Sequence, residues 1–157
     1  MLTVPPLPTL DPPYGWRVVM AAGTRFTGRF RLHGPGTDTE VEVEVEVERC
    51  AAGRLRDTYP VSAHDVEVRV ASGALDTLPS EALRMLADAV WTADPRCRRI
   101  VYAAAADGDL NSFAQAEAAG FRHVVDVDLA DEEVRLLVAE PEWVTGGDRR
   151  LDRVPQS

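Results

Sequence analysis

The chain has 157 residues, 45% of them hydrophobic, and a formal net charge of −9 at pH 7. This length and hydrophobic content fit one globular domain, and the acidic balance argues against a nucleic-acid partner, because phosphate backbones are bound through clustered basic side chains. Cys50 and Cys97 have no paired spacing, so neither a disulfide framework nor a zinc site is expected, and no metal is predicted.

Residue composition and the N-terminal sequence indicate the cellular location of the protein. All 17 basic residues are arginine, and alanine and valine are abundant, which is typical of a GC-rich bacterial genome. The first residues lack the basic region and the apolar run of a signal peptide, and nothing resembles a membrane span. The sequence therefore predicts a cytoplasmic protein with reduced thiols and no membrane partner.

The N-terminal half predicts an extended arm followed by strands. Residues 1–14 contain five prolines, which cannot continue a helix, so we expect a polyproline-like arm on the surface. Strands are expected at 15–20 and 27–32. In residues 39–48 valine alternates with glutamate, so this strand has one apolar and one acidic face. The acidic face could attract an amine substrate, or it could be a solvated face that discourages edge-to-edge association.

The C-terminal half predicts strands alternating with helices. In chain order we expect a strand at 64–70, a helix at 79–94, a buried strand at 99–106, a helix at 109–120, and strands at 122–129 and 134–140. Asp109 can cap the second helix, and Gly120 can take the left-handed conformation that ends it. We therefore expect one α/β domain of the α+β type over residues 15–144, with a flexible tail at 145–157.

The second predicted helix carries a family resemblance. The segment Asp109-Leu-Asn-Ser-Phe-Ala-Gln-Ala-Glu-Ala-Ala-Gly-Phe121 resembles the pattern N-x-x-S-x-x-x-x-E-K-x-G-F of the GNAT superfamily of acyl-CoA-dependent N-acyltransferases. Aligned on its final glycine and phenylalanine, the serine of the pattern falls on Ser112 and the glutamate on Glu117. The order of elements from residue 64 onward is also similar to the C-terminal half of the GNAT fold.

This resemblance implies a fold and a cofactor. The fold is a GNAT-like mixed, mostly antiparallel sheet with two helices in the C-terminal half and a strand-rich N-terminal half. Its fourth and fifth strands splay apart to admit acetyl-CoA or another acyl-CoA as co-substrate. In this sequence the implied cofactor-binding residues are Val68, Val70, Ser72, Gly73, Asn111 and Ser112.

The resemblance also implies direct acyl transfer to a small-molecule or peptide amine. A base removes a proton from the acceptor, which then attacks the thioester carbonyl held by strand amides. Glu67 is the expected base, and Tyr102 is the tyrosine that could act as the acid. Each also has a structural interpretation, Glu67 as a strand glutamate without a catalytic role and Tyr102 as a buried aromatic whose hydroxyl finds a backbone partner.

The chain departs from the family pattern within the helix signature, where Asp109 and Ala118 stand in place of the asparagine and the lysine, and at three further places. Ala116 stands where many members carry a tyrosine that protonates the departing thiolate. The loop at 71–80, where backbone amides would hold the cofactor phosphates, keeps one glycine, has no basic residue and contains Asp76. No segment before residue 60 has the apolar periodicity of a helix, so one sheet face would stay open to solvent or to a second subunit of a homodimer.

Three interpretations follow from these observations. The first is a GNAT-like N-acyltransferase, favoured by the order of elements and by the helix signature. The second is a non-catalytic GNAT-like binding or assembly module that has lost CoA binding, favoured by the altered loop and by Ala116. The third is an α+β domain without this ancestry.

Overall fold

Seven strands form one sheet in the computed structural model, which describes residues 3–36, 39–58, 60–71, 78–106, 110–129 and 132–141. The strand order is β1-β2-β3-β4-β5-β7-β6. The strands are β1 (Arg17–Gly23), β2 (Thr27–Pro35), β3 (Glu40–Arg49), β4 (Val66–Val70), β5 (Ile100–Ala105), β6 (Arg122–Asp128) and β7 (Glu133–Ala139). Neighbouring strands are antiparallel except β4 and β5, which are parallel. The expected mixed, mostly antiparallel sheet is therefore confirmed.

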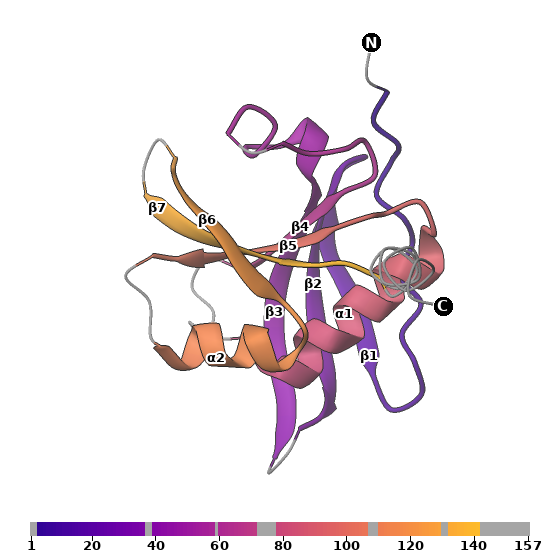
Figure 1. The fold of residues 1–157 in the computed structure, drawn as a ribbon. Helices are drawn as coiled ribbons and strands as arrows, with labels where there is room; N and C mark the ends of the chain where they lie inside the picture. The colour runs from indigo at the N-terminus through magenta and orange to yellow at the C-terminus, as the bar shows by residue number, and fades with distance from the viewer. Residues whose placement is uncertain are drawn as a thin grey trace, which may run out of the picture.

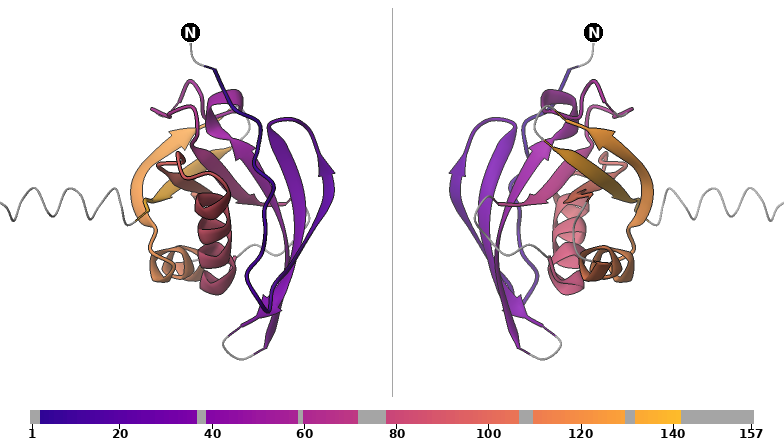
Figure 2. Two further views of the ribbon diagram at one scale, coloured as in Figure 1. Left: turned by 90° about the vertical axis from the view of Figure 1, so that its right-hand side faces the viewer. Right: turned by 90° about the vertical axis from the view of Figure 1, so that its left-hand side faces the viewer.

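Both α-helices, α1 (Ser80–Ala93) and α2 (Leu110–Ala118), lie on the same side of the sheet, which curves around them (Figures 1 and 2). The apolar stripe of α1, formed by Leu83, Leu86 and Val90, is buried in one core cluster with Val45 of β3 and Val68 of β4. Full burial of each such side chain stabilises the fold by roughly 1.5–3 kcal/mol. None of the helices in the described ranges is long and apolar enough to cross a membrane.

The opposite face of the sheet is divided between charged and apolar surfaces. Over β2 and β3 it carries the glutamates of the alternating strand, with Arg29 paired to Glu44 and His33 paired to Glu40. Over β5 and β7 it is covered by the chain that leaves β3, where the 3-10 turn η1 (Cys50–Ala52) is followed by Leu55. The face that was expected to stay open therefore presents ion pairs in one part and a small second core in the other.

The N-terminal arm is held by a buried arginine at the end of β3. Arg49 is 1% exposed, and its guanidinium donates to the carbonyl oxygens of Pro6 (3.0 Å from Nη2) and His64 (2.6 Å from Nη1) and pairs with Asp94 (2.8 Å). Burial raises the pKa of Asp94, but hydrogen bonds from the His64 ring, the Arg49 side chain and the Arg96 amide outweigh it, so this pKa lies below its usual value. One side chain thus joins the arm, the entry to β4 and the end of α1.

Gly120 closes α2 as the sequence predicts. Its φ is +97°, and its amide donates to the carbonyl of Glu117, while the amide of Phe121 donates to the carbonyl of Ala116. These two bonds form a Schellman motif, which satisfies carbonyl groups at the helix end. Phe121 then turns inward and is 3% exposed.

Replacing Gly120 with alanine is expected to destabilise the protein by about 1–2 kcal/mol, because an L-residue with a side chain is strained at positive φ. A Cβ atom at this position would meet no heavy atom within 4 Å, so the loss should be conformational and not steric. Urea denaturation measures it. The matched control is Gly120→Asn, since asparagine tolerates this conformation better. Equal losses for both variants, or none for alanine, would contradict the explanation.

Candidate functional site: a gap between two parallel strands

The parallel strands β4 and β5 separate after three residue pairs. Their ladder consists of Val66 with Ile100, Glu67 with Val101, and Val68 with Tyr102. Beyond this point β4 stays paired with β3 through residue 70, and β5 stays paired with β7 through residue 105. The two strands therefore diverge, and Ser112 in the first turn of α2 contacts Tyr102, which belongs to the last pair of this ladder. This is the splayed arrangement that the GNAT resemblance implies for these two strands.

A buried contact joins Tyr102 of β5 to Ser112 of α2 beside the point where β4 and β5 separate. Tyr102 is 1% exposed, its hydroxyl lies 3.4 Å from Oγ of Ser112, and its ring meets Phe121 edge-on at a centroid distance of 6.5 Å. Burial raises the pKa of the Tyr102 phenol, and hydrogen bonds with Ser112 and the backbone of Leu78 offset only part of that effect. Tyr102 therefore keeps its proton at neutral pH.

Three of the predicted site residues lie together in the structure. Val68, Tyr102 and Ser112 meet at the gap, as just described. Val70 lies at the end of β4 and is half-buried, and Asn111 is exposed on the first turn of α2. Ser72 and Gly73 lie outside the described residues, as do Asp76 and Asp109.

Glu67 lies on the opposite face of the sheet from Tyr102, because successive strand residues alternate and the two belong to adjacent pairs of the ladder. Its carboxylate is 0% exposed. Arg54 donates to Oε2 of Glu67 from Nη2 (2.8 Å) and Nε (3.2 Å), and Nη1 of Arg69 lies 3.2 Å from Oε1. This last contact lacks hydrogen-bond geometry, so Oε1 has no hydrogen-bond partner. The two residues predicted as base and acid are thus separated by the sheet.

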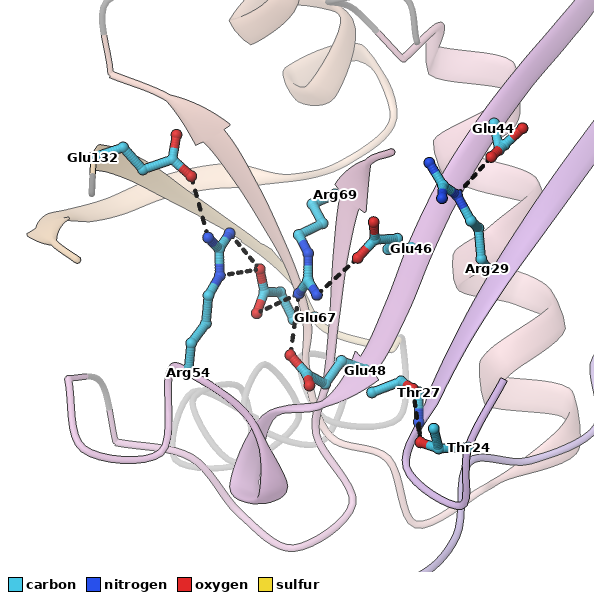
Figure 3. Close-up of polar contacts among 10 residues, drawn as sticks. All are labelled: Thr24, Thr27, Arg29, Glu44, Glu46, Glu48, Arg54, Glu67, Arg69 and Glu132. Carbon is cyan, nitrogen blue, oxygen red and sulfur yellow. Dashed lines mark hydrogen bonds and ion pairs between the residues drawn. The ribbon is translucent and has the colours of Figure 1, made fainter. Parts of the chain in front are cut away.

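The Glu67 carboxylate belongs to a group of four carboxylates and two guanidiniums that are joined by ion pairs, and we call this group the Glu67 cluster (Figure 3). Its members are Glu46, Glu48, Arg54, Glu67, Arg69 and Glu132. Arg69 pairs with three glutamates, and although burial alone lowers its pKa, these carboxylates raise the pKa of Arg69 above its usual value. With four negative and two positive groups, the cluster has a formal charge of −2.

Sequence reasoning misses the two arginines of the cluster for different reasons. Arg69 shares a strand face with Glu67, and the i, i+2 spacing could have predicted their contact. Arg54 comes from a run of turns after η1, where no periodicity indicates direction. Its contact with Glu67 depends on how that segment folds back onto the sheet.

Neither cysteine is available as a nucleophile. Burial, with a smaller effect from nearby carboxylates, raises the pKa of the Cys50 thiol well above its usual value, and burial raises the pKa of Cys97 to about 12. Both thiols therefore stay protonated at neutral pH. Within the described ranges, no group of three or more histidine, cysteine, aspartate or glutamate side chains is placed to hold a metal ion.

The strand order, the splayed parallel pair and the helix signature together define a GNAT-like fold. Solved structures share it. Aminoglycoside N-acetyltransferase AAC(6')-Ib11 superposes with a TM-score of 0.57 at 13% identity, over 74% of this chain and 67% of that one. The related AAC(6')-Ib in complex with coenzyme A and kanamycin gives a TM-score of 0.55 at 12% identity, over 74% and 67% of the two chains.

A third similar structure is an uncharacterized protein from Bacillus halodurans, with a TM-score of 0.56 at 18% identity. The match covers 71% of this chain but only 58% of that one, so the present chain spans little more than half its length. No protein-family model matches the sequence, and no curated protein sequence is similar to it. Identities this low establish the fold alone.

Proposed function

We propose that the protein is an N-acyltransferase that moves an acetyl or other acyl group from acyl-CoA to an amine. The divergence of β4 and β5 beside the first turn of α2 is the observation that carries the proposal. Strand amides at a gap of this kind can bind a thioester carbonyl, and amides that stabilise a developing oxyanion are a major source of catalysis in acyl transfer. Neighbouring structures that hold coenzyme A in the same fold support the cofactor.

We assign the cofactor contacts to Val68, Val70, Ser72, Gly73, Asn111 and Ser112. Tyr102 is the proposed acid, because its protonated hydroxyl lies beside Ser112 at the gap. Glu67 is the proposed base on the other face of the sheet, where the acceptor amine would approach. A small-molecule or peptide amine is the proposed acceptor, and the aminoglycoside complexes of similar structures are consistent with an amine of this kind.

Acetyl-CoA is expected to raise the melting temperature of the purified protein. At a concentration one hundred times the dissociation constant, a ligand that binds only the folded state stabilises it by about 2.7 kcal/mol. Differential scanning fluorimetry and calorimetric titration measure the effect. Acetyl-pantetheine and adenosine 3',5'-bisphosphate, tested separately, show whether the thioester arm or the phosphates provide the affinity. The absence of any shift with millimolar acetyl-CoA would contradict the proposal.

The alternative function is a GNAT-like binding or assembly module without CoA. Two observations favour it: the Glu67 carboxylate is already held by two arginines, and Ala116 is fully buried where many relatives of this fold class carry a tyrosine. A protein that does not bind acetyl-CoA but captures a partner would support this function.

The proposal includes a cytoplasmic location and a homodimer in which a second copy covers the charged face of β2 and β3. Positive and negative side chains such as Arg29 and Glu44 lie together on that face, and paired charges of this kind can meet either solvent or another subunit. Light scattering coupled to size-exclusion chromatography gives the oligomeric state. A monomer at all concentrations would exclude the dimer and leave the catalytic proposal standing.

A further inference from the structure

We propose that the Glu67 cluster is a binding site for an organic cation, that the Arg54 guanidinium occupies it in this structure, and that a primary ammonium or guanidinium ligand binds by displacing Arg54. The inference rests on the proposed function in one respect: the ligand would be the amine acceptor, which then binds as a cation. The site itself is defined by the contacts of Arg54, Glu67 and Glu132 (Figure 3).

Arg54 is the exchangeable cation of the cluster. It comes from a run of turns after η1, its side chain is 30% exposed, and it bridges the buried Glu67 to Glu132, whose side chain is 50% exposed. Arg69 differs, because it extends from a central strand and pairs with three glutamates of β3 and β4. A loop side chain with one exposed partner can leave at a smaller cost than a strand side chain with three partners.

Glu67 provides the second observation, because one of its oxygens lacks a hydrogen bond although the residue is completely buried. That oxygen has an ion-pair contact with Nη1 of Arg69 at 3.2 Å but no hydrogen bond, and Arg54 does not supply one, because both of its bonds go to the other oxygen. A compact ammonium has three rotatable donors and can serve both oxygens, which the planar fork of Arg54 does not do here.

The charge of the cluster favours the exchange. The cluster contains four carboxylates and two guanidiniums, so its formal charge is −2 with Arg54 in place. The formal charge becomes −3 when the Arg54 side chain leaves the cluster. A neutral amine or alcohol of the same shape would leave that charge uncompensated. The site therefore selects cationic ligands. Their N–H groups would replace the Arg54 nitrogens at Oε2 of Glu67 and could add a donor to Oε1.

The test compares Arg54→Ala with the unmodified protein, using ethylammonium and ethylguanidinium chloride as probes at low millimolar concentration. Ethylurea is the neutral control, and sodium chloride at equal ionic strength corrects for screening. We expect both cations to bind Arg54→Ala at least tenfold more tightly than the unmodified protein by calorimetric titration, and to raise its melting temperature. Ethylurea should do neither. The additional change Glu67→Gln should abolish cation binding.

Arg56→Ala is the matched control, because Arg56 lies in the same segment and pairs only with the exposed Asp57. It should bind the probes no better than the unmodified protein. If Arg54→Ala does not fold, Arg54→Gln keeps most of the side chain and is used in its place. A folded Arg54 variant that binds neither cation would overturn the inference and make Arg54 a structural bridge.

Acetyl-CoA binding separates this outcome from a failure of the proposed function. Arg54 contacts Glu67 on one face of the sheet, and Ser112 lies at the gap on the other face, so acetyl-CoA should bind equally to the unmodified protein and to Arg54→Ala. Cation binding without acetyl-CoA binding would contradict the acyltransferase and leave the cation site. Acetyl-CoA binding without cation binding would contradict the cation site alone.

Discussion

Replacing Arg49 with methionine should lower the free energy of unfolding by about 3–5 kcal/mol, the usual cost of removing one partner of a buried ion pair. Arg49 is 1% exposed and holds the carbonyls of Pro6 and His64 as well as the carboxylate of Asp94. Methionine fills part of the volume but donates no hydrogen bond. Three segments that are distant in the sequence lose their common contact.

Urea denaturation measures this loss, and limited proteolysis of the arm gives an independent readout. Arg49→Lys is the control, because lysine keeps the charge but cannot reach three acceptors with one planar group. We expect it to lose less stability than Arg49→Met and still to expose the arm to protease. A methionine variant as stable as the unmodified protein would show that the arm and the end of α1 do not depend on this residue.

The partner carboxylate makes part of this stability depend on pH. The pKa of Asp94 is lower in the folded protein than its unfolded value of about 3.9. The group therefore stabilises the fold fully above about pH 4, and this contribution disappears as the pH falls through the folded pKa. The difference in unfolding free energy between the unmodified protein and Asp94→Asn should be largest near neutral pH and shrink in acid. A difference that is constant with pH would contradict the assignment.

Tyr102→Ala should destabilise the protein by about 3–5 kcal/mol, as expected for removal of a buried aromatic side chain. The ring is 1% exposed and packs against Phe121, which follows the C-terminal end of α2. Tyr102→Phe keeps the ring and removes only the hydroxyl that contacts Ser112, so its cost should be about 1 kcal/mol. The pair of variants separates packing from hydrogen bonding at the gap.

The phenylalanine variant also tests the proposed role of Tyr102 as an acid. Loss of a general acid typically lowers kcat by about 10²–10⁴-fold, whereas a purely structural tyrosine would leave kcat nearly unchanged. Phe113→Ala is the control, because Phe113 is a buried aromatic residue of α2 that contacts Arg135 and follows Ser112 in the chain. It should lose stability and keep acetyl-CoA affinity. Full activity in Tyr102→Phe would exclude the acid role and leave the fold argument intact.

Hydrophobic periodicity predicts much of this fold, because a half-buried strand buries every second residue and an amphipathic helix buries every third or fourth residue. Alternating valine and glutamate predict β3 almost to its ends, and the stripe of α1 is confirmed. The second strand is longer than its predicted range of 27–32 and continues to Pro35, because the ten-residue partner β3 keeps pairing with it. Local pattern carries no information on the length of a partner strand, so boundaries of this kind are missed.

The site is harder to predict because its contacts depend on how distant elements meet. The resemblance implies that Val68 and Ser112 lie near one gap, and the structure places them there through Tyr102. It does not predict that the side chain of Glu67 is buried, since that depends on Arg54 from a segment with no pattern. Burial of a charged strand residue follows from the loop that covers it and not from its own strand.

The short ladder between β4 and β5 also divides the sheet into two units. On one side β1 to β4 form an antiparallel meander, and on the other β5, β6 and β7 form a second antiparallel unit. Among the residues that the structure describes, three parallel pairs connect the two units within the sheet. Such a seam can open locally at a free-energy cost below that of global unfolding. Local opening along this line would let the two halves of the sheet move apart while each half keeps its own hydrogen bonds.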